Sequence, residues 1–321
     1  MESQPIVEFP AEWLPHEATW MTWPENVETW PNNLAEAQAE FENLVRAIAE
    51  TEPVYLIASD KWLPLLQKKF ASASPVRLIE IPTNDSWIRD YGPTMIKSRE
   101  KAETLGVAWS YDGWGKKYPP FDLDQAAAAA ILESLGLPCL RSPLVLEGGA
   151  IETNGQTLLT TLGCVAKRNP GWSLEQIERE LRYRIGIRDV LFVDVDEIAG
   201  DDTDGHIDQA ARFINEETLL ISARQWETFP TDELANRFNL LELCDPLEEV
   251  RLFGSILPAS YTNFYFANEV VLVPQFGDRH DPTALRSIAE HCPDREVIGL
   301  PSRHLSAGLG SFHCLTQQQP E

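Results

Sequence analysis

The chain has 321 residues, of which 43% are hydrophobic and 24% charged, so its composition is that of a globular protein rather than a disordered one. Fifty acidic residues against 26 basic ones give a net charge of −24, which repels nucleic acid and anionic membranes and attracts cations. The apolar runs are too short for a membrane span and the N-terminus lacks the features of a signal peptide, so we expect a cytoplasmic protein that binds neither nucleic acid nor membrane.

Helical and extended segments alternate along the whole chain. Residues 34–50 carry a one-sided apolar stripe typical of an amphipathic helix. Further helices are predicted at 124–135, 234–241 and 282–291. A capping box formed by Ser173 and Gln176 predicts the start of one more helix. Short β-prone runs lie at 54–58, 76–81, 94–96, 157–161, 190–195, 211–214, 218–222, 270–273 and 297–300. This alternation, without a low-complexity linker, predicts an α/β fold that forms a single domain over residues 1–321.

Two segments with unusual side chains follow predicted strands. Residues 84–93 come directly after the strand at 76–81 and contain Trp87 and Asp90, and Glu147 precedes two glycines after another apolar run. The ends of strands are where α/β proteins place functional loops. A turn with an Asp–Arg pair explains the first segment equally well, and a solvated glutamate beside a bulge explains the second.

An acidic segment at 201–208 contains four aspartates and His206. Such a concentration of like charge favours a bound cation. An EF-hand is a poor match because glycine and alanine fall at ligand positions, and a zinc site would need nearby His or Cys ligands that are absent. If the segment is a strand, His206 and Asp208 share one face. That arrangement suits an imidazole that transfers protons beside an anion that holds a cation.

Cys314 follows a glycine-rich approach near the end of the chain, in which Gly308 and Gly310 precede it. The five cysteines are odd in number and form no CxxC pair, so we expect free thiols in a reducing compartment. A thiolate is a strong nucleophile, and a neighbouring cation stabilises it. The alternative, a buried small hydrophobic residue, is our interpretation of Cys139, Cys164, Cys244 and Cys292.

One reaction uses all of these groups. Attack on the carbon of a guanidinium ion needs carboxylates for its N–H edges, a thiolate nucleophile and a base that protonates the departing ammonia. The four segments supply a cysteine, a histidine, two aspartates and a further acid, and the reaction calls for no metal and no other cofactor.

The segments together resemble the agmatine deiminase family of guanidino-group-modifying enzymes, which lies near the bacterial peptidyl-arginine deiminases. The resemblance runs from about residue 8 to 320 and rests on Asn84-Asp85-Ser86-Trp87-x-Arg89-Asp90-x-Gly92-Pro93, Glu147-Gly148-Gly149, Thr203-Asp204-Gly205-His206-x-Asp208 and His313-Cys314-x-Thr316-Gln317-Gln318. It implies the pentein fold, a five-bladed pseudo-symmetric α/β propeller of ββαβ units around a central active site.

The resemblance also implies a role for each site residue. Cys314 would be the nucleophile, and His206, oriented by Glu147, would be the general acid and base. The substrate-binding residues would be Asp90 and Asp208 on the guanidinium, Trp87 along the channel and Asp202 near the distal amine. The implied reaction converts agmatine, a small cationic guanidine, to N-carbamoylputrescine and ammonia through a covalent amidino-cysteine, as in putrescine biosynthesis. A homodimer is compatible with this family.

Some positions differ from the family pattern. Asp202 stands where glutamate is usual, Tyr91 stands where threonine is common, and the glycine run before Cys314 is thinner. These differences concern the tail of the substrate, so peptidyl arginine or free arginine stays an alternative. A protein from another class, which binds guanidines or metal through the 201–208 cluster without catalysis, is the third hypothesis.

Overall fold

The computed structural model describes residues 6–72, 75–101 and 103–321, and within them the strands form five sheets of three or four strands and one hairpin. Two sheets have four strands: β1 (Val7–Glu8), β5 (Thr94–Ser98), β6 (Thr104–Ser110) and β7 (Cys139–Val145); and β19 (Thr316–Pro320), β2 (His16–Thr22), β3 (Val54–Ala58) and β4 (Val76–Glu80). Three sheets have three strands: β8 (Ile151–Thr153), β9 (Thr157–Thr161) and β10 (Asp189–Val193); β11 (Ala211–Phe213), β12 (Thr218–Ser222) and β13 (Asn239–Leu243); and β16 (Tyr265–Phe266), β17 (Val270–Gln275) and β18 (Glu296–Pro301). The hairpin pairs β14 (Arg251–Leu252) with β15 (Ser255–Ile256).

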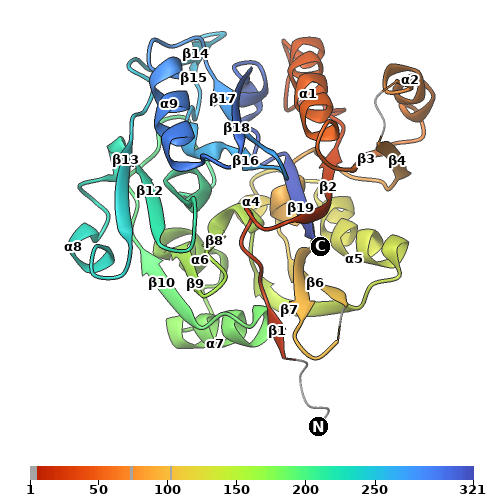
Figure 1. Cartoon of the computed structure of the whole chain (residues 1–321). Coiled ribbons are helices and arrows are strands. Elements are labelled where there is room, and N and C mark those ends of the chain that lie inside the picture. Colours follow the sequence, from red (N-terminus) through yellow and green to blue (C-terminus); the bar gives the residue numbers. More distant parts are fainter. Residues whose placement is uncertain (1–5, 73–74, 102) are drawn as a thin grey trace.

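Each of the five sheets repeats one local pattern, in which an antiparallel pair is followed by a parallel neighbour. The parallel pairs are β6–β7, β9–β10, β12–β13, β17–β18 and β2–β3. A parallel neighbour needs a crossover connection. The longest helix in each crossover is, in the same order, α5 (Asp122–Leu135), α7 (Leu174–Ile185), α8 (Thr231–Leu234), α9 (Asp281–His291) and α1 (Leu34–Ala49). Figure 1 shows them at the periphery of the molecule.

The last strand closes the chain onto its beginning. β19 pairs antiparallel with β2, so that Thr316 lies opposite Met21 and the residues just before it lie near the middle of the molecule (Figure 1). The remaining helices are α2 (Leu63–Lys69), α3 (Ile88–Tyr91), α4 (Gly113–Lys116) and α6 (Leu162–Arg168). The short α3 follows β4 and carries Asp90, and α6 follows β9 directly.

The hydrophobic core is divided between the sheets and their helices. α1 buries Phe41, Leu44 and Ile48, in one cluster with Trp20 and Trp23 of the N-terminal segment. Three further clusters lie with the other sheets and helices. No helix in the described residues is both long enough and apolar enough to cross a membrane.

Most of the predicted elements are present, and the capping box of Ser173 and Gln176 is confirmed. The helix predicted at 234–241 is wrong. α8 ends at Leu234, and residues 239–243 form β13, where Leu240 and Leu241 pair with β12. A short apolar run has no periodicity that separates helix from strand. Here the run forms a strand that pairs with the edge of β12.

Candidate active site

Three side chains from two separate segments surround Gly149. A Cβ atom built on this glycine would lie 2.6 Å from Nδ1 of His206, 2.8 Å from Oδ1 of Asp90 and 3.0 Å from Oδ2 of Asp208. The backbone N–H of Gly149 donates to Oδ1 of Asp90 at 2.9 Å. The bare glycine backbone thus allows an imidazole and two carboxylates to converge on one point.

Asp90 is held in α3, fully inside the molecule. Its Oδ2 accepts a hydrogen bond of 2.9 Å from the indole N–H of Trp114, which comes from the connection after β6. Burial raises the pKa of Asp90; His206 opposes this rise, and the neighbouring carboxylates of Asp208 and Glu147 add to it. The three carboxylates therefore carry more negative charge than a protonated His206 balances, which favours a cationic ligand.

His206 and Asp208 do not lie in a strand, contrary to our prediction. Ile207–Gln209 form a 3-10 turn that His206 precedes in an extended conformation. Both side chains nevertheless reach Gly149, because the turn, rather than strand alternation, directs them there.

The imidazole of His206 lies between two carboxylates. Its Nδ1 is 3.7 Å from Oδ1 of Asp90, and its Nε2 is 3.5 Å from Oε2 of Glu147. Burial favours the neutral ring, but Asp90, Cys164 and Glu147 raise the pKa of His206 well above 6.5. The neighbouring carboxylates therefore favour the imidazolium form, which can give up a proton.

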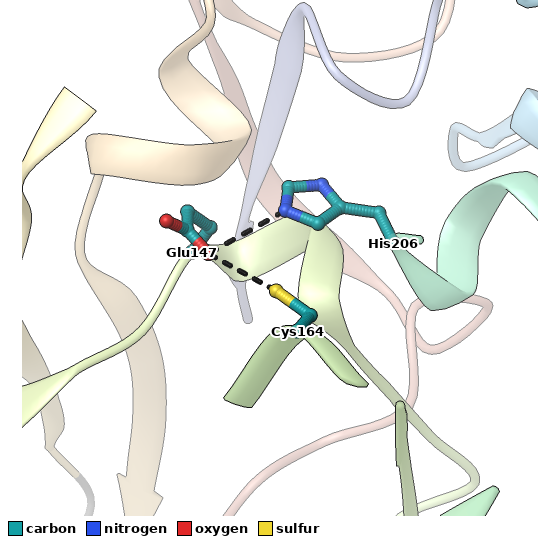
Figure 2. Close-up of side chains that lie close together, drawn as sticks. All are labelled: Glu147, Cys164 and His206. Atoms are coloured by element: carbon teal, nitrogen blue, oxygen red, sulfur yellow. Dashed lines mark hydrogen bonds and ion pairs between the residues drawn. The ribbon is translucent and has the colours of Figure 1, made fainter. Parts of the chain in front are cut away.

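Glu147 is completely buried, so the alternative of a solvated glutamate is wrong. Its Oε1 accepts a 2.6 Å hydrogen bond from Nε of Arg168, and its Oε2 lies 3.4 Å from Sγ of Cys164. Figure 2 shows Glu147 facing both Cys164 and His206. Burial alone would raise the pKa of Glu147, but His206 and Arg168 lower it. The carboxylate therefore stays ionised beside the imidazolium.

Glu147, Cys164 and His206 also have the spacing of metal ligands, with donor atoms within 4.8 Å of one another. Two features of the cluster disfavour a divalent ion. The guanidinium of Arg168 already neutralises Glu147, and burial raises the pKa of Cys164 to about 11, so that its thiol keeps the proton a metal would displace. We interpret the cluster as the support of an imidazole.

Asp208 is oriented by the residue before the cysteine. Its Oδ2 accepts a 2.8 Å hydrogen bond from Nδ1 of His313, whose Nε2 lies 3.0 Å from Oε2 of Glu12. Burial would raise the pKa of Asp208, but the hydrogen bond and charge of His313 lower it. Its Oδ1 has no hydrogen-bond partner among the described residues. A buried ionised oxygen without a donor is suited to an N–H edge of a ligand.

Cys314 lies in the turn before β19 and is 6% exposed. Its Sγ is 3.6 Å from Oδ2 of Asp208 and 3.3 Å from Nδ2 of Asn263. Burial, Asp208 and Asp90 raise the pKa of Cys314 well above 9.0. This environment favours the protonated thiol, and a bound cation would favour the thiolate.

The two residues predicted to bind the rest of the substrate differ in their placement. Trp87 is buried beside Gly310 in the approach to Cys314, and its ring lies 5.4 Å from that of Trp30. Asp202 is half-buried in a surface loop. Its carboxylate accepts from the hydroxyl of Tyr118, and its hydrogen bonds do not reach the groups around Gly149.

Sequence reasoning missed the residues that support the site. Arg168, His313 and Asn263 each contact a predicted site residue. His313 lies in a motif that carried the family resemblance, which gave a signal for it. Nothing in the sequence set Asn263 apart.

A buried thiol beside an imidazole and paired carboxylates, on a mixed α/β fold, defines a hydrolase of guanidino groups with a cysteine nucleophile. The chain belongs to the family described as Porphyromonas-type peptidyl-arginine deiminase, which it matches over residues 8–320.

Individual relatives agree with this assignment over nearly their whole length. The agmatine deiminase of Medicago truncatula is 33% identical, and the alignment covers 97% of this chain and 96% of that protein. The solved structure of the agmatine deiminase of Enterococcus faecalis is 29% identical, with a TM-score of 0.89 and coverage of 100% and 99%. That of the C. jejuni agmatine deiminase with substrate bound is 26% identical, with a TM-score of 0.89 and coverage of 98% and 96%.

Proposed function

We propose that the chain hydrolyses agmatine to N-carbamoylputrescine and ammonia through a covalent amidino-cysteine. The observation that carries this proposal is that Asp208, which meets Asp90 and His206 at Gly149, also lies 3.6 Å from the sulfur of Cys314. Carboxylates that bind the N–H edges of a guanidinium place its carbon within reach of the sulfur.

The first half-reaction forms the covalent intermediate. The bound guanidinium favours ionisation of Cys314, whose thiol proton is released to solvent, and the thiolate attacks the guanidinium carbon and forms a C–S bond. The imidazolium of His206 then donates its proton to one terminal nitrogen, the C–N bond to that nitrogen breaks, and ammonia leaves. The product is an S-alkylated amidino cation that Asp90 and Asp208 still hold.

The second half-reaction hydrolyses the intermediate. His206, now neutral, accepts a proton from water as the water oxygen attacks the same carbon. The C–S bond breaks, the thiolate of Cys314 leaves, and loss of the hydroxyl proton gives the carbonyl of a ureido product. That proton and the released ammonia make ammonium overall. Glu147 orients the imidazole in both steps.

The five repeated strand units support a finer description of the fold. Each unit has an antiparallel pair and a parallel strand reached through a helix, and the site residues come from the connections between strands. We describe this as a pentein, a pseudo-symmetric five-bladed propeller whose centre is the active site. We also expect a cytoplasmic homodimer, which size-exclusion chromatography with light scattering would test.

The tail of the substrate is the less constrained part of the proposal. Trp87 would line the channel and Asp202 would attract the distal amine, assisted by the net charge of −24. Peptidyl arginine is the second candidate, because the matched family carries that name. Initial rates of ammonia release from agmatine, free arginine and a peptidyl arginine, measured side by side, separate the candidates.

The chemistry itself is tested with a variant that lacks the nucleophile. Cys314→Ala should release no ammonia, and the wild type should accumulate an adduct on Cys314 that acid quenching and mass spectrometry detect. Ammonia release by Cys314→Ala would refute the mechanism. Failure of the wild type on all three substrates would favour a non-catalytic guanidine-binding protein.

A further inference from the structure

Asn263 contacts the sulfur of Cys314 directly. The amide Nδ2 of this residue lies 3.3 Å from Sγ, which is a normal length for an N–H···S hydrogen bond. Asn263 is completely buried and ends a short 3-10 turn at Tyr261–Asn263. The turn is tied to the site, because the hydroxyl of Thr262 donates to the carbonyl of Asp208 at 3.0 Å.

The orientation of the Asn263 amide is fixed by the other end of the side chain. Its Oδ1 accepts from the backbone N–H of His313 at 3.1 Å and from that of Cys314 at 3.4 Å. An oxygen is required there, since two N–H groups point at it. The NH₂ group must therefore face the sulfur, where it acts as a donor.

A donor at this position offsets an unfavourable local charge. Asp208 and Asp90 lie around the thiol and oppose its ionisation, and within the described residues no cationic side chain forms a hydrogen bond with Sγ. Besides Asn263, the backbone of Ser311 hydrogen-bonds to the sulfur, and Nε2 of Gln209 lies 3.9 Å away. A neutral amide can stabilise a thiolate without repelling a guanidinium, whereas a lysine or arginine in its place would repel the substrate.

We propose that Asn263 is a catalytic residue that donates a hydrogen bond to the sulfur of Cys314 whenever the sulfur is a thiolate. This inference extends the proposed function, because the thiolate occurs twice in the cycle. It forms before attack on the carbon, and it forms again when the C–S bond breaks and the electron pair returns to sulfur. The donor lowers the energy of both states.

Two variants remove the donor in different ways. Asn263→Asp keeps an oxygen for the two backbone N–H groups but replaces the donor by an acceptor, and Asn263→Ala removes both contacts without adding charge. Asn268→Asp is the matched control. Within the described residues the side chain of Asn268 bonds to the backbone of His16, and its backbone N–H donates to the carboxylate of Glu52.

The first readout is alkylation of Cys314 by iodoacetamide at pH 8, followed by peptide mass spectrometry. Below the pKa of the thiol the rate is proportional to the thiolate fraction, so the ratio of each variant's rate to the wild-type rate reports the change in that fraction. We expect this ratio to be about 0.1 for Asn263→Ala, lower for Asn263→Asp and near 1 for Asn268→Asp. Alkylation needs no substrate, so the result stands even if agmatine is not hydrolysed.

The second readout is turnover of agmatine. We expect kcat to fall about 100-fold in both Asn263 variants with KM changed less than about threefold, because the amide contacts the sulfur rather than the substrate. Ratios within twofold of the Asn268→Asp control in both variants would overturn the proposal. An equal fall of the alkylation ratio in Asn268→Asp would also overturn the proposal, because the effect would then come from a general disturbance of the fold.

Discussion

Gly149 offers the sharpest test of the site because three site residues occupy the space that a side chain at this position would need. A Cβ at this position would lie 2.6 Å from Nδ1 of His206 and 2.8 Å from Oδ1 of Asp90, whereas ordinary contact begins at 3.4 Å. In Gly149→Ala the imidazole must therefore move by about 0.8 Å and the carboxylate by about 0.6 Å. A displacement near 1 Å from productive geometry costs about 100-fold in rate.

The effect of Gly149→Ala on stability should be much smaller. The backbone φ of Gly149 is not positive, so alanine adopts it without backbone strain, and overpacking of this kind costs about 1–3 kcal/mol. We expect kcat/KM for agmatine to fall about 100-fold while the urea midpoint shifts only slightly. Steady-state kinetics and equilibrium urea unfolding, followed by tryptophan fluorescence, measure the two effects on the same sample.

Two other glycines serve as controls for Gly149→Ala. In Gly171→Ala nothing lies within 4 Å of the new Cβ, so both activity and stability should match the wild type. In Gly148→Ala the Cβ would lie 2.0 Å from the backbone oxygen of Arg89, so folding itself should fail or weaken by about 3 kcal/mol or more. An activity of Gly149→Ala within threefold of Gly171→Ala would refute the geometry described here.

The remaining predictions concern charge. Arg168→Met leaves Glu147 buried without its 2.6 Å partner and should lower the free energy of unfolding by about 3–5 kcal/mol in urea titrations; a loss under 1 kcal/mol would contradict this. Burial raises the pKa of Asp124 to about 7 from 3.8, so the folded state keeps a proton that the unfolded state loses, and stability should fall as pH rises from about 4 to 7. Asp124→Asn should remove up to about 4 kcal/mol of that fall, and an unchanged pH profile of Tm would disprove it. Asp202→Asn should raise KM for agmatine severalfold at nearly constant kcat, and an unchanged KM would remove Asp202 from the substrate site.

The sequence predicted the chemistry better than the local structure. Alternating segments indicated an α/β fold, and the chemical needs of a guanidinium selected Cys314, His206 and the carboxylates before any geometry was known. The expectation that His206 and Asp208 share a strand face was wrong, although both reach the site. A 3-10 turn after a loop with positive φ at Asp204 and Gly205 has no hydrophobic period by which sequence could identify it.

The residues that sequence could not reveal are those that act through long-range contacts. Arg168 is 21 positions from Glu147, and Asn263 is 51 positions from Cys314. Neither has a neighbour in sequence that explains its charge or amide. Glu147 comes from the connection after β7, and Cys314 is brought to Asn263 as β19 pairs with β2.

The same closure explains why the nucleophile sits so late in the chain. β19 completes the sheet that β2 begins, and Arg89, just before Asp90, donates its backbone N–H to the carbonyl of Cys314 at 3.2 Å. The pairing of the final strand therefore helps to hold the carboxylate of Asp90 and the sulfur of Cys314 relative to each other. A chain that lacks β19 should keep most of its sheets but lose the registration between Asp90 and Cys314 on which the proposed reaction depends.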